Sequence, residues 1–141
     1  YGASPFNTPS DQLKPVMKLS APIVSIKTLQ AGESVGYGAT WIANIDTTIA
    51  IVGIGYGDGY PRHAKNGTPV LINSVLCSLV GRVSMDLICV DIGTTKANVG
   101  DNAILWGDEK LHVETVATYS DTISYELLTG ISSRVEFVQH A

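Results

Sequence analysis

The chain alternates between short runs rich in apolar and β-branched residues and short clusters of glycine, proline, asparagine and aspartate. β-Branched residues favour strands, and the clusters between them are typical of tight turns. Short strands with frequent turns are typical of an all-β barrel or sandwich, so we predict a mainly β fold. The predicted strands are residues 16–29, 34–41, 47–56, 68–73, 75–92 with a break or bulge near Gly81, 103–106 and 135–138. The predicted turns are residues 31–32, 44–46, 66–67, 73–74 and 100–102.

Near the C-terminal end, apolar residues recur at every third or fourth position, which predicts two short helices. Ser120 or Asp121 would cap the second helix, and Gly130 would end it. Neither capping residue has glutamate or glutamine three positions later, so no capping box is expected. The apolar positions are Val113, Val116 and Ala117 in the first helix and Ile123, Leu127, Leu128 and Ile131 in the second.

The composition is that of one well-packed domain. The chain has 141 residues, of which 45% are hydrophobic and 16% charged, with a net charge of -4. This balance excludes a disordered chain and indicates no nucleic-acid-binding surface. The apolar runs are far shorter than the ~20 residues of a membrane span, and no signal peptide is visible. We therefore expect a soluble, cytoplasmic protein that binds neither nucleic acid nor membranes.

Residues 1–15 begin without methionine and form a largely polar segment with several prolines. Such a segment is typical of a connection between domains. We expect an interdomain connection over residues 1–15 and one β domain over residues 16–141. The chain would then be part of a longer protein.

The cysteines and acidic residues do not indicate a disulfide or a metal site. Cys77 and Cys89 fit neither a Cys-x-x-Cys redox pair nor a zinc knuckle, so we expect free thiols in the core. The possible metal ligands lie in separate segments, and no metal site is expected. They are Asp58, Asp86, Asp91, Glu109, His63 and His112.

Residues 53–62 read Gly-Ile-Gly-Tyr-Gly-Asp-Gly-Tyr-Pro-Arg and surround Tyr56 with glycines. The spacing is neither the G-x-G-x-x-G of dinucleotide-binding loops nor a Walker loop, and no helix is predicted to follow. Two interpretations remain open for the segment. In one, the glycines permit a bulge at a strand end and Tyr56 packs against a neighbour. In the other, the phenol is left accessible for chemistry.

Six blocks, in order along the chain, resemble the C-terminal domain of alanine racemase, a pyridoxal-phosphate (PLP) enzyme. Each block alone is weak evidence, but together they extend over nearly the whole chain. They are Tyr1-Gly2-x-Ser4-Pro5, Gly36-Tyr37-Gly38-x-Thr40-Trp41, Gly55-Tyr56-Gly57-Asp58-Gly59-Tyr60-Pro61-Arg62, Gly67-Thr68-Pro69-Val70-Leu71, Val80-Gly81-Arg82-Val83-Ser84-Met85-Asp86, and Ile123-Ser124-Tyr125-Glu126 followed by Ser133-Arg134-Val135.

The resemblance implies a two-domain enzyme that interconverts L- and D-alanine for peptidoglycan precursor synthesis. An N-terminal (β/α)8 barrel would carry PLP as a Schiff base on a lysine, and this chain would be the mostly β second domain. The family's homodimer is head-to-tail, so that the C-terminal domain of one subunit completes the active site of the other. Because the PLP lysine belongs to the barrel, we expect this chain alone to be inactive.

The resemblance also implies roles for individual residues. Tyr56 would be one of two bases and would act on the α-proton of L-alanine. A free phenol has a pKa of about 10, so a phenolic base needs neighbours that favour phenolate, and we expect these on the missing barrel. Met85 would donate its backbone N–H to the substrate carboxylate. Arg82, Ile123 and Tyr125 would line the substrate entrance, and Tyr125 would also contact the PLP phosphate.

Each of these residues also has an ordinary structural interpretation. Met85 in a predicted strand fits a role as core filler, Arg82 fits a solvated charge, and Tyr125 fits packing beside Leu128 on a helix. Two alternative functions remain open as well. One is a stand-alone β-barrel binding or assembly module that uses the glycine loop to contact a protein. The other is a PLP racemase that acts on serine or on several amino acids.

Overall fold

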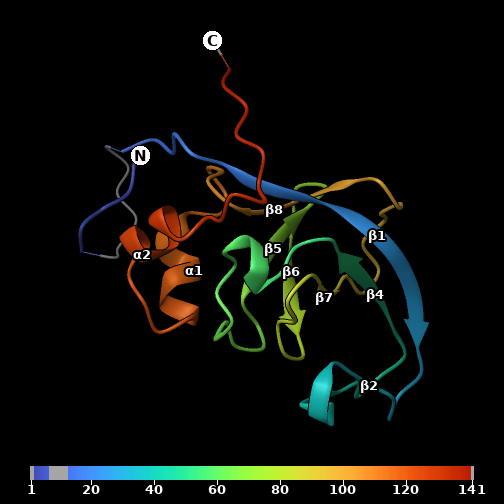
Figure 1. Ribbon diagram of the computed structural model, residues 1–141. Helices are drawn as coiled ribbons and strands as arrows, with labels where there is room; N and C mark the ends of the chain where they lie inside the picture. Colours follow the sequence, from blue (N-terminus) through green and yellow to red (C-terminus); the bar gives the residue numbers. More distant parts are fainter. Residues whose placement is uncertain (1, 7–12, 141) are drawn as a thin grey trace.

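The computed structural model describes residues 2–6 and 13–140 (Figure 1). Within these residues, six strands close into an antiparallel barrel in the order β1-β4-β7-β6-β5-β8, which confirms the mainly β prediction. A closed barrel has no free edge strand. The strands are β1 (Leu19–Leu29), β4 (Thr47–Val52), β5 (Pro69–Ile72), β6 (Val75–Val80), β7 (Ile88–Asp91) and β8 (Asn102–Trp106).

The long strand β1 closes the barrel because it pairs with two different strands. Its first half pairs with β8, from Leu19 opposite Trp106, and its second half pairs with β4, up to Leu29 opposite Thr47. A register shift between Ile23 and Ser25 lies close to the point where the partner of β1 changes from β8 to β4. Figure 1 shows β1 passing along the whole barrel.

Large side chains fill the hydrophobic core. Tyr60 and Trp106 are fully buried and stack with their ring centroids 6.3 Å apart and an interplanar angle of 13°. Ile72 and Leu79 are also fully buried, in adjacent strands. The segment that carries Tyr60 is therefore anchored in the core, four residues after Tyr56.

The predicted strand over residues 34–41 is wrong. The segment forms two short paired strands, β2 (Ser34–Val35) and β3 (Trp41–Ile42), separated by a turn of 3-10 helix, η1 (Tyr37–Ala39). Gly36 and Gly38 have φ angles of 80° and 71°, which a continuous strand does not allow. This small sheet lies beside one end of the barrel in Figure 1.

The two predicted helices are confirmed as α1 (Val113–Tyr119) and α2 (Ser124–Thr129), but the predicted cap is wrong. Ile123 is the N-cap of α2, with an extended backbone and no side-chain cap bond. Ser120 instead ends α1, where its hydroxyl donates to the carbonyl of Val116. Gly130 ends α2 as predicted. Among the described helices, none is long and apolar enough to cross a lipid bilayer.

Three further strand predictions differ from the structure. Residues 47–56 form a strand only to Val52: Gly53 still donates its N–H to the carbonyl of Pro22 in β1, but Ile54 donates back to the carbonyl of Val52, so the chain turns there. Residues 75–92 break at Gly81 as expected, but a loop of several residues separates β6 from β7. Residues 135–138 form no strand, because the closed barrel offers them no edge for pairing.

The predicted connection over residues 1–15 falls partly on residues 1 and 7–12, which lie outside the described residues. Within residues 2–6, Ser4 is buried against the two helices. Its N–H donates to Oε1 of Glu114 at 2.6 Å, and its carbonyl accepts from the hydroxyl of Ser124 at 3.3 Å. This part of the chain is therefore packed on the domain.

Candidate active site

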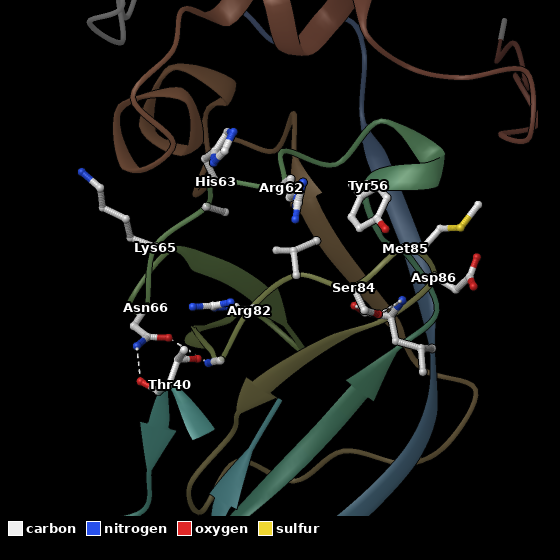
Figure 2. A pocket seen from close by; sticks show the side chains of 14 residues that line it. Thr40, Tyr56, Arg62, His63, Lys65, Asn66, Arg82, Ser84, Met85 and Asp86 are labelled. Carbon is white, nitrogen blue, oxygen red and sulfur yellow. Dashed lines mark hydrogen bonds between the residues drawn. The ribbon is translucent and has the colours of Figure 1, made fainter. Parts of the chain in front are cut away.

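A wide groove of about 1210 Å³ lies between the segment after β4 and the loop that joins β6 to β7. Figure 2 shows the side chains that line it, which come mostly from these two segments. Both segments leave the barrel at the same end because β4 and β7 are paired neighbours. Residues distant in the sequence, among them Tyr56, Arg82 and Met85, are thereby brought to one groove.

Tyr56 opens a single turn of 3-10 helix, η2 (Tyr56–Asp58), and its side chain is 44% exposed. The turn is joined to the opposite loop by two backbone hydrogen bonds. Tyr56 N–H donates to the carbonyl of Ser84 at 3.0 Å, and Gly57 N–H donates to the carbonyl of Met85 at 2.9 Å. The phenol is therefore carried by a turn whose backbone is held in place, after the strand rather than at its end.

The glycines around Tyr56 permit this close contact between segments. Gly55 has an extended backbone, with φ -155°, which any residue could adopt. A Cβ at Gly55 would nevertheless overlap the carbonyl oxygens of Ser84 and Met85. Close approach of two backbones, rather than a bulge in a strand, is thus the reason for glycine at this position.

Cationic side chains lie near the phenol. The guanidinium carbon of Arg62 lies 5.6 Å from the centroid of the Tyr56 ring, a cation–π contact that restricts the ring. Arg82 and Lys65 line the same groove. These groups, which Figure 2 shows along one side of the groove, suit an anionic ligand.

Met85 lies in the loop before β7, so its predicted place in a strand is wrong. Its side chain is 51% exposed, which excludes a role as core filler. The loop is closed by Ser84, whose N–H and hydroxyl donate to the carbonyl of Leu87 at 3.1 and 2.9 Å. Within residues 2–6 and 13–140, no group accepts a hydrogen bond from Met85 N–H. This N–H therefore has no acceptor within the described residues.

The structure brings together three of the five predicted site residues. Tyr56, Met85 and Arg82 line the groove, whereas Ile123 and Tyr125 lie at the start of α2 and do not line it. Ile123 and Tyr125 are 55% and 48% exposed, so neither is core filler. Their predicted roles at an entrance stay predictions.

Sequence reasoning missed the contacts of Arg62 and Arg134, although both residues lie in the blocks that carry the resemblance. Arg134 Nη2 donates to Oδ1 of Asp86 at 2.6 Å, and its Nε lies 3.4 Å from Oδ1 of Asp58. The hydrogen bond to Asp86 and the charge of Asp58 raise the pKa of the Arg134 guanidinium above its usual value. No spacing rule joins residues this far apart, so the sequence carried no signal of these pairs.

Within the described residues, the cysteines and the candidate metal ligands form neither a disulfide nor a metal site. Cys77 and Cys89 are free thiols, and burial raises the pKa of both. Across the described residues, no group of three or more histidines, cysteines and carboxylates is arranged to hold a metal ion.

The fold and the groove define a closed antiparallel β-barrel domain that presents an exposed tyrosine beside a free backbone N–H. The family described as "Alanine racemase, C-terminal domain" matches residues 16–139. The chain therefore belongs to this family.

Relatives and solved structures agree with this assignment. The chain is 75% identical over 138 residues to alanine racemase of Vesicomyosocius okutanii. The aligned region covers 98% of this chain and 39% of that protein. It is 53% identical to alanine racemase of Vibrio vulnificus, and the aligned region covers 96% of this chain and 39% of that protein.

Among solved structures, alanine racemase from Acinetobacter baumannii is similar, with a TM-score of 0.90 and 48% sequence identity. The superposed region covers 95% of this chain and 38% of that one. Biosynthetic alanine racemase from Pseudomonas aeruginosa is also similar, with a TM-score of 0.88 and 46% sequence identity. The superposed region covers 96% of this chain and 38% of that one. The chain thus spans about 39% of the length of the relatives that it matches.

Proposed function

We propose that this chain is the C-terminal domain of an alanine racemase and supplies Tyr56 as one of two bases that interconvert L- and D-alanine. The observation that supports the proposal is the exposed phenol of Tyr56, in one groove with the free N–H of Met85. The full-length enzyme would act in the cytoplasm, where D-alanine is needed for peptidoglycan precursors.

The family's cofactor is PLP, and the donors on this chain fit its chemistry. The groove has cationic side chains, including Arg62 and Arg82, and a free backbone N–H, and the hydroxyl-bearing side chain of Tyr125 is 48% exposed. Phosphate and carboxylate oxygens accept hydrogen bonds from such groups. Tyr125 would donate to the phosphate, and most other PLP contacts would come from the N-terminal domain. When bound, PLP supplies an electron sink that stabilises negative charge on the α-carbon of the amino acid.

Each residue of the groove then has a defined task. Met85 N–H binds the carboxylate of alanine and so sets the position of the α-carbon. The Tyr56 phenol oxygen removes or returns the proton on one face of that carbon, and a base from the other domain serves the opposite face. Arg62 restricts the Tyr56 ring by its cation–π contact, and the bond to Ser84 holds the backbone of Tyr56.

A head-to-tail homodimer would complete the site. The groove holds one candidate base, whereas racemisation needs proton transfer on two faces. An open groove with cationic lining is suited to receive another domain with bound anionic groups. We propose that this domain belongs to the partner subunit.

The test of the proposed function is Tyr56→Phe in the full-length protein. Loss of the phenolic oxygen removes one proton-transfer group, so kcat should fall by about 10²–10⁴-fold in both directions. PLP absorbance and the melting temperature should be unchanged, because the Tyr56 side chain is half-exposed. The measurement is the rate of D-alanine formation from L-alanine and of the reverse reaction.

Tyr60→Phe is a matched control. Tyr60 lies four residues further on and is fully buried, and no described residue forms a hydrogen bond with its hydroxyl. The variant should therefore keep turnover within about twofold of wild type, because removal of an unpartnered hydroxyl is nearly neutral. Near-normal turnover of Tyr56→Phe in both directions would remove Tyr56 from the role of base.

No observation favours a racemase specific for serine or a stand-alone binding module. Rates with alanine and serine in the same full-length protein would measure the substrate range.

A further inference from the structure

Arg134 contacts both of the segments that carry the candidate base and the free N–H. It lies after α2, and its guanidinium donates to Asp86, the residue directly after Met85, at 2.6 Å. Its Nε also lies 3.4 Å from Asp58, two residues after Tyr56. One side chain therefore bridges η2 and the loop before β7.

Further hydrogen bonds extend this contact into the backbone of η2. Oδ2 of Asp58 accepts from Gly55 N–H at 2.9 Å. Ser132, which lies close to Arg134 in sequence, donates its hydroxyl to the carbonyl of Gly57 at 2.8 Å and its N–H to the carbonyl of Asp58 at 3.0 Å. The C-terminal segment thus contacts η2 at several points.

Arg134 also packs directly on the turn. A Cβ at Gly57 would overlap Nη1 of Arg134 and come within 3.0 Å of the carbonyl oxygen of Met85. The space that a side chain at position 57 would need is occupied by the guanidinium. Glycine at this position therefore allows Arg134 to lie against the backbone beside Tyr56.

We propose that Arg134 is a positioning residue that holds η2 and the loop of Met85 at a fixed separation. Two backbone hydrogen bonds join these segments on one side, from Tyr56 to Ser84 and from Gly57 to Met85. Arg134 joins them through their side chains. The relative position of the Tyr56 hydroxyl and Met85 N–H then depends on this side chain. The inference rests on the proposed function of Tyr56.

Arg134 also balances charge beside the proposed substrate site. Asp86 is adjacent to Met85, where the carboxylate of alanine would bind. Without the guanidinium, the carboxylates of Asp58 and Asp86 would both be uncompensated, and the charge of Asp86 would repel the substrate carboxylate. Removal of Arg134 should thus raise KM as well as lower kcat.

A purely structural role would give a different result. The side chains of Arg134 and Asp86 are 44% and 61% exposed, and exposed ion pairs contribute little to global stability. We therefore expect Arg134→Met in the full-length protein to change the melting temperature by no more than about 3 °C. Its kcat should fall by about 10–100-fold, because small displacements of catalytic groups cost rates of this order.

A second readout does not depend on activity. Hydrogen–deuterium exchange of the full-length protein without substrate reports the local opening of residues 55–59 and 84–87. In Arg134→Met, the amides of both segments should exchange at least about threefold faster, because their shared restraint is lost. Exchange in β4 and β7 should be unchanged.

Matched variants complete the experiment. Arg134→Lys keeps the charge but lacks the planar fork that reaches two carboxylates, so it should recover part of the lost kcat. Lys18→Met removes a partly exposed ion pair outside the groove, Lys18 with Asp108 at 3.3 Å, and should leave kcat and exchange unchanged. If Arg134→Met does not fold, Arg134→Gln provides the same test with the same expected changes.

Measurement of Tyr56→Phe in parallel separates this inference from the proposed function. The inference is overturned if Tyr56→Phe is inactive while Arg134→Met keeps kcat within about twofold of wild type and unchanged exchange. The proposed function itself is overturned if Tyr56→Phe remains active. Loss of kcat in Arg134→Met, with faster local exchange and partial recovery in Arg134→Lys, supports the inference.

Discussion

Gly55 and Gly59, on either side of Tyr56, both lack space for a side chain, since a Cβ at Gly59 would overlap the carbonyl oxygen of Gly130, but only Gly59 also has a left-handed backbone. Gly55 has an extended backbone, and only the lack of space beside the carbonyls of Ser84 and Met85 excludes a side chain. Gly59 has a φ of 105°, in the left-handed region that favours glycine, and its N–H donates to the carbonyl of Tyr56. The sequence shows both as the same residue, and only the structure separates the two causes.

Gly55→Ala in the full-length protein tests whether the close contact between the backbone at Gly55 and the carbonyls of Ser84 and Met85 requires glycine. The added methyl group would overlap two carbonyl oxygens, so the turn must move, with an expected cost of about 1–3 kcal/mol and a loss of activity of roughly tenfold or more. Gly53→Ala is the control, because its Cβ would meet mainly the side chain of Val24, which can shift. The measurements are kcat and thermal unfolding. Equal effects of the two substitutions would contradict this explanation.

At the scale of elements, the sequence located the two helices and the end of α2 at Gly130, but not the start of α2. Ser120 and Asp121 are good capping residue types, yet the hydroxyl of Ser120 bonds back into α1 and Asp121 lies in the turn with a φ of 54°. The N-cap of α2 is Ile123, which offers no side-chain acceptor. Glu126 lies three residues later, so position 123 lacks only a hydroxyl to complete a capping box.

Ile123→Ser should therefore stabilise the first turn of α2. A capping hydroxyl contributes about 0.5–1 kcal/mol, which corresponds to roughly two- to fivefold slower hydrogen exchange of the first amides of α2. Ile123→Ala is the control, because it removes the same exposed apolar side chain without adding an acceptor. The two variants should differ in exchange at Tyr125 and Glu126. Identical exchange in both would show that the cap does not form.

At the scale of the whole molecule, the barrel is closed but the candidate site is not. The core around Tyr60 and Trp106 is buried without help from another domain, whereas the groove of Tyr56 is open. The relatives are more than twice as long as this chain, which covers 39% of the first of them. The proposed racemisation needs a second base, so this chain is sufficient for the fold but not for the proposed activity.

The chain expressed alone should therefore fold but not racemise. In a mixture with PLP and L-alanine, D-alanine should form no faster than with PLP alone, because one tyrosine serves only one face of the α-carbon. Far-ultraviolet circular dichroism verifies that the barrel is folded in the same sample. Sustained turnover above the PLP control would contradict the prediction.

The sequence alone determined the mainly β class, most strand centres, both helices and the resemblance that singled out Tyr56, because these depend on local periodicity and on short motifs. Strand ends and the lack of a strand at residues 135–138 depended on pairing partners, which local pattern does not contain, and the break at residues 34–41 depended on the left-handed backbone of Gly36 and Gly38. Only the tertiary structure brought Tyr56 beside the loop of Met85 and joined Asp58 to Asp86 through Arg134. Contacts between segments this far apart in sequence are decided by the closure of the barrel.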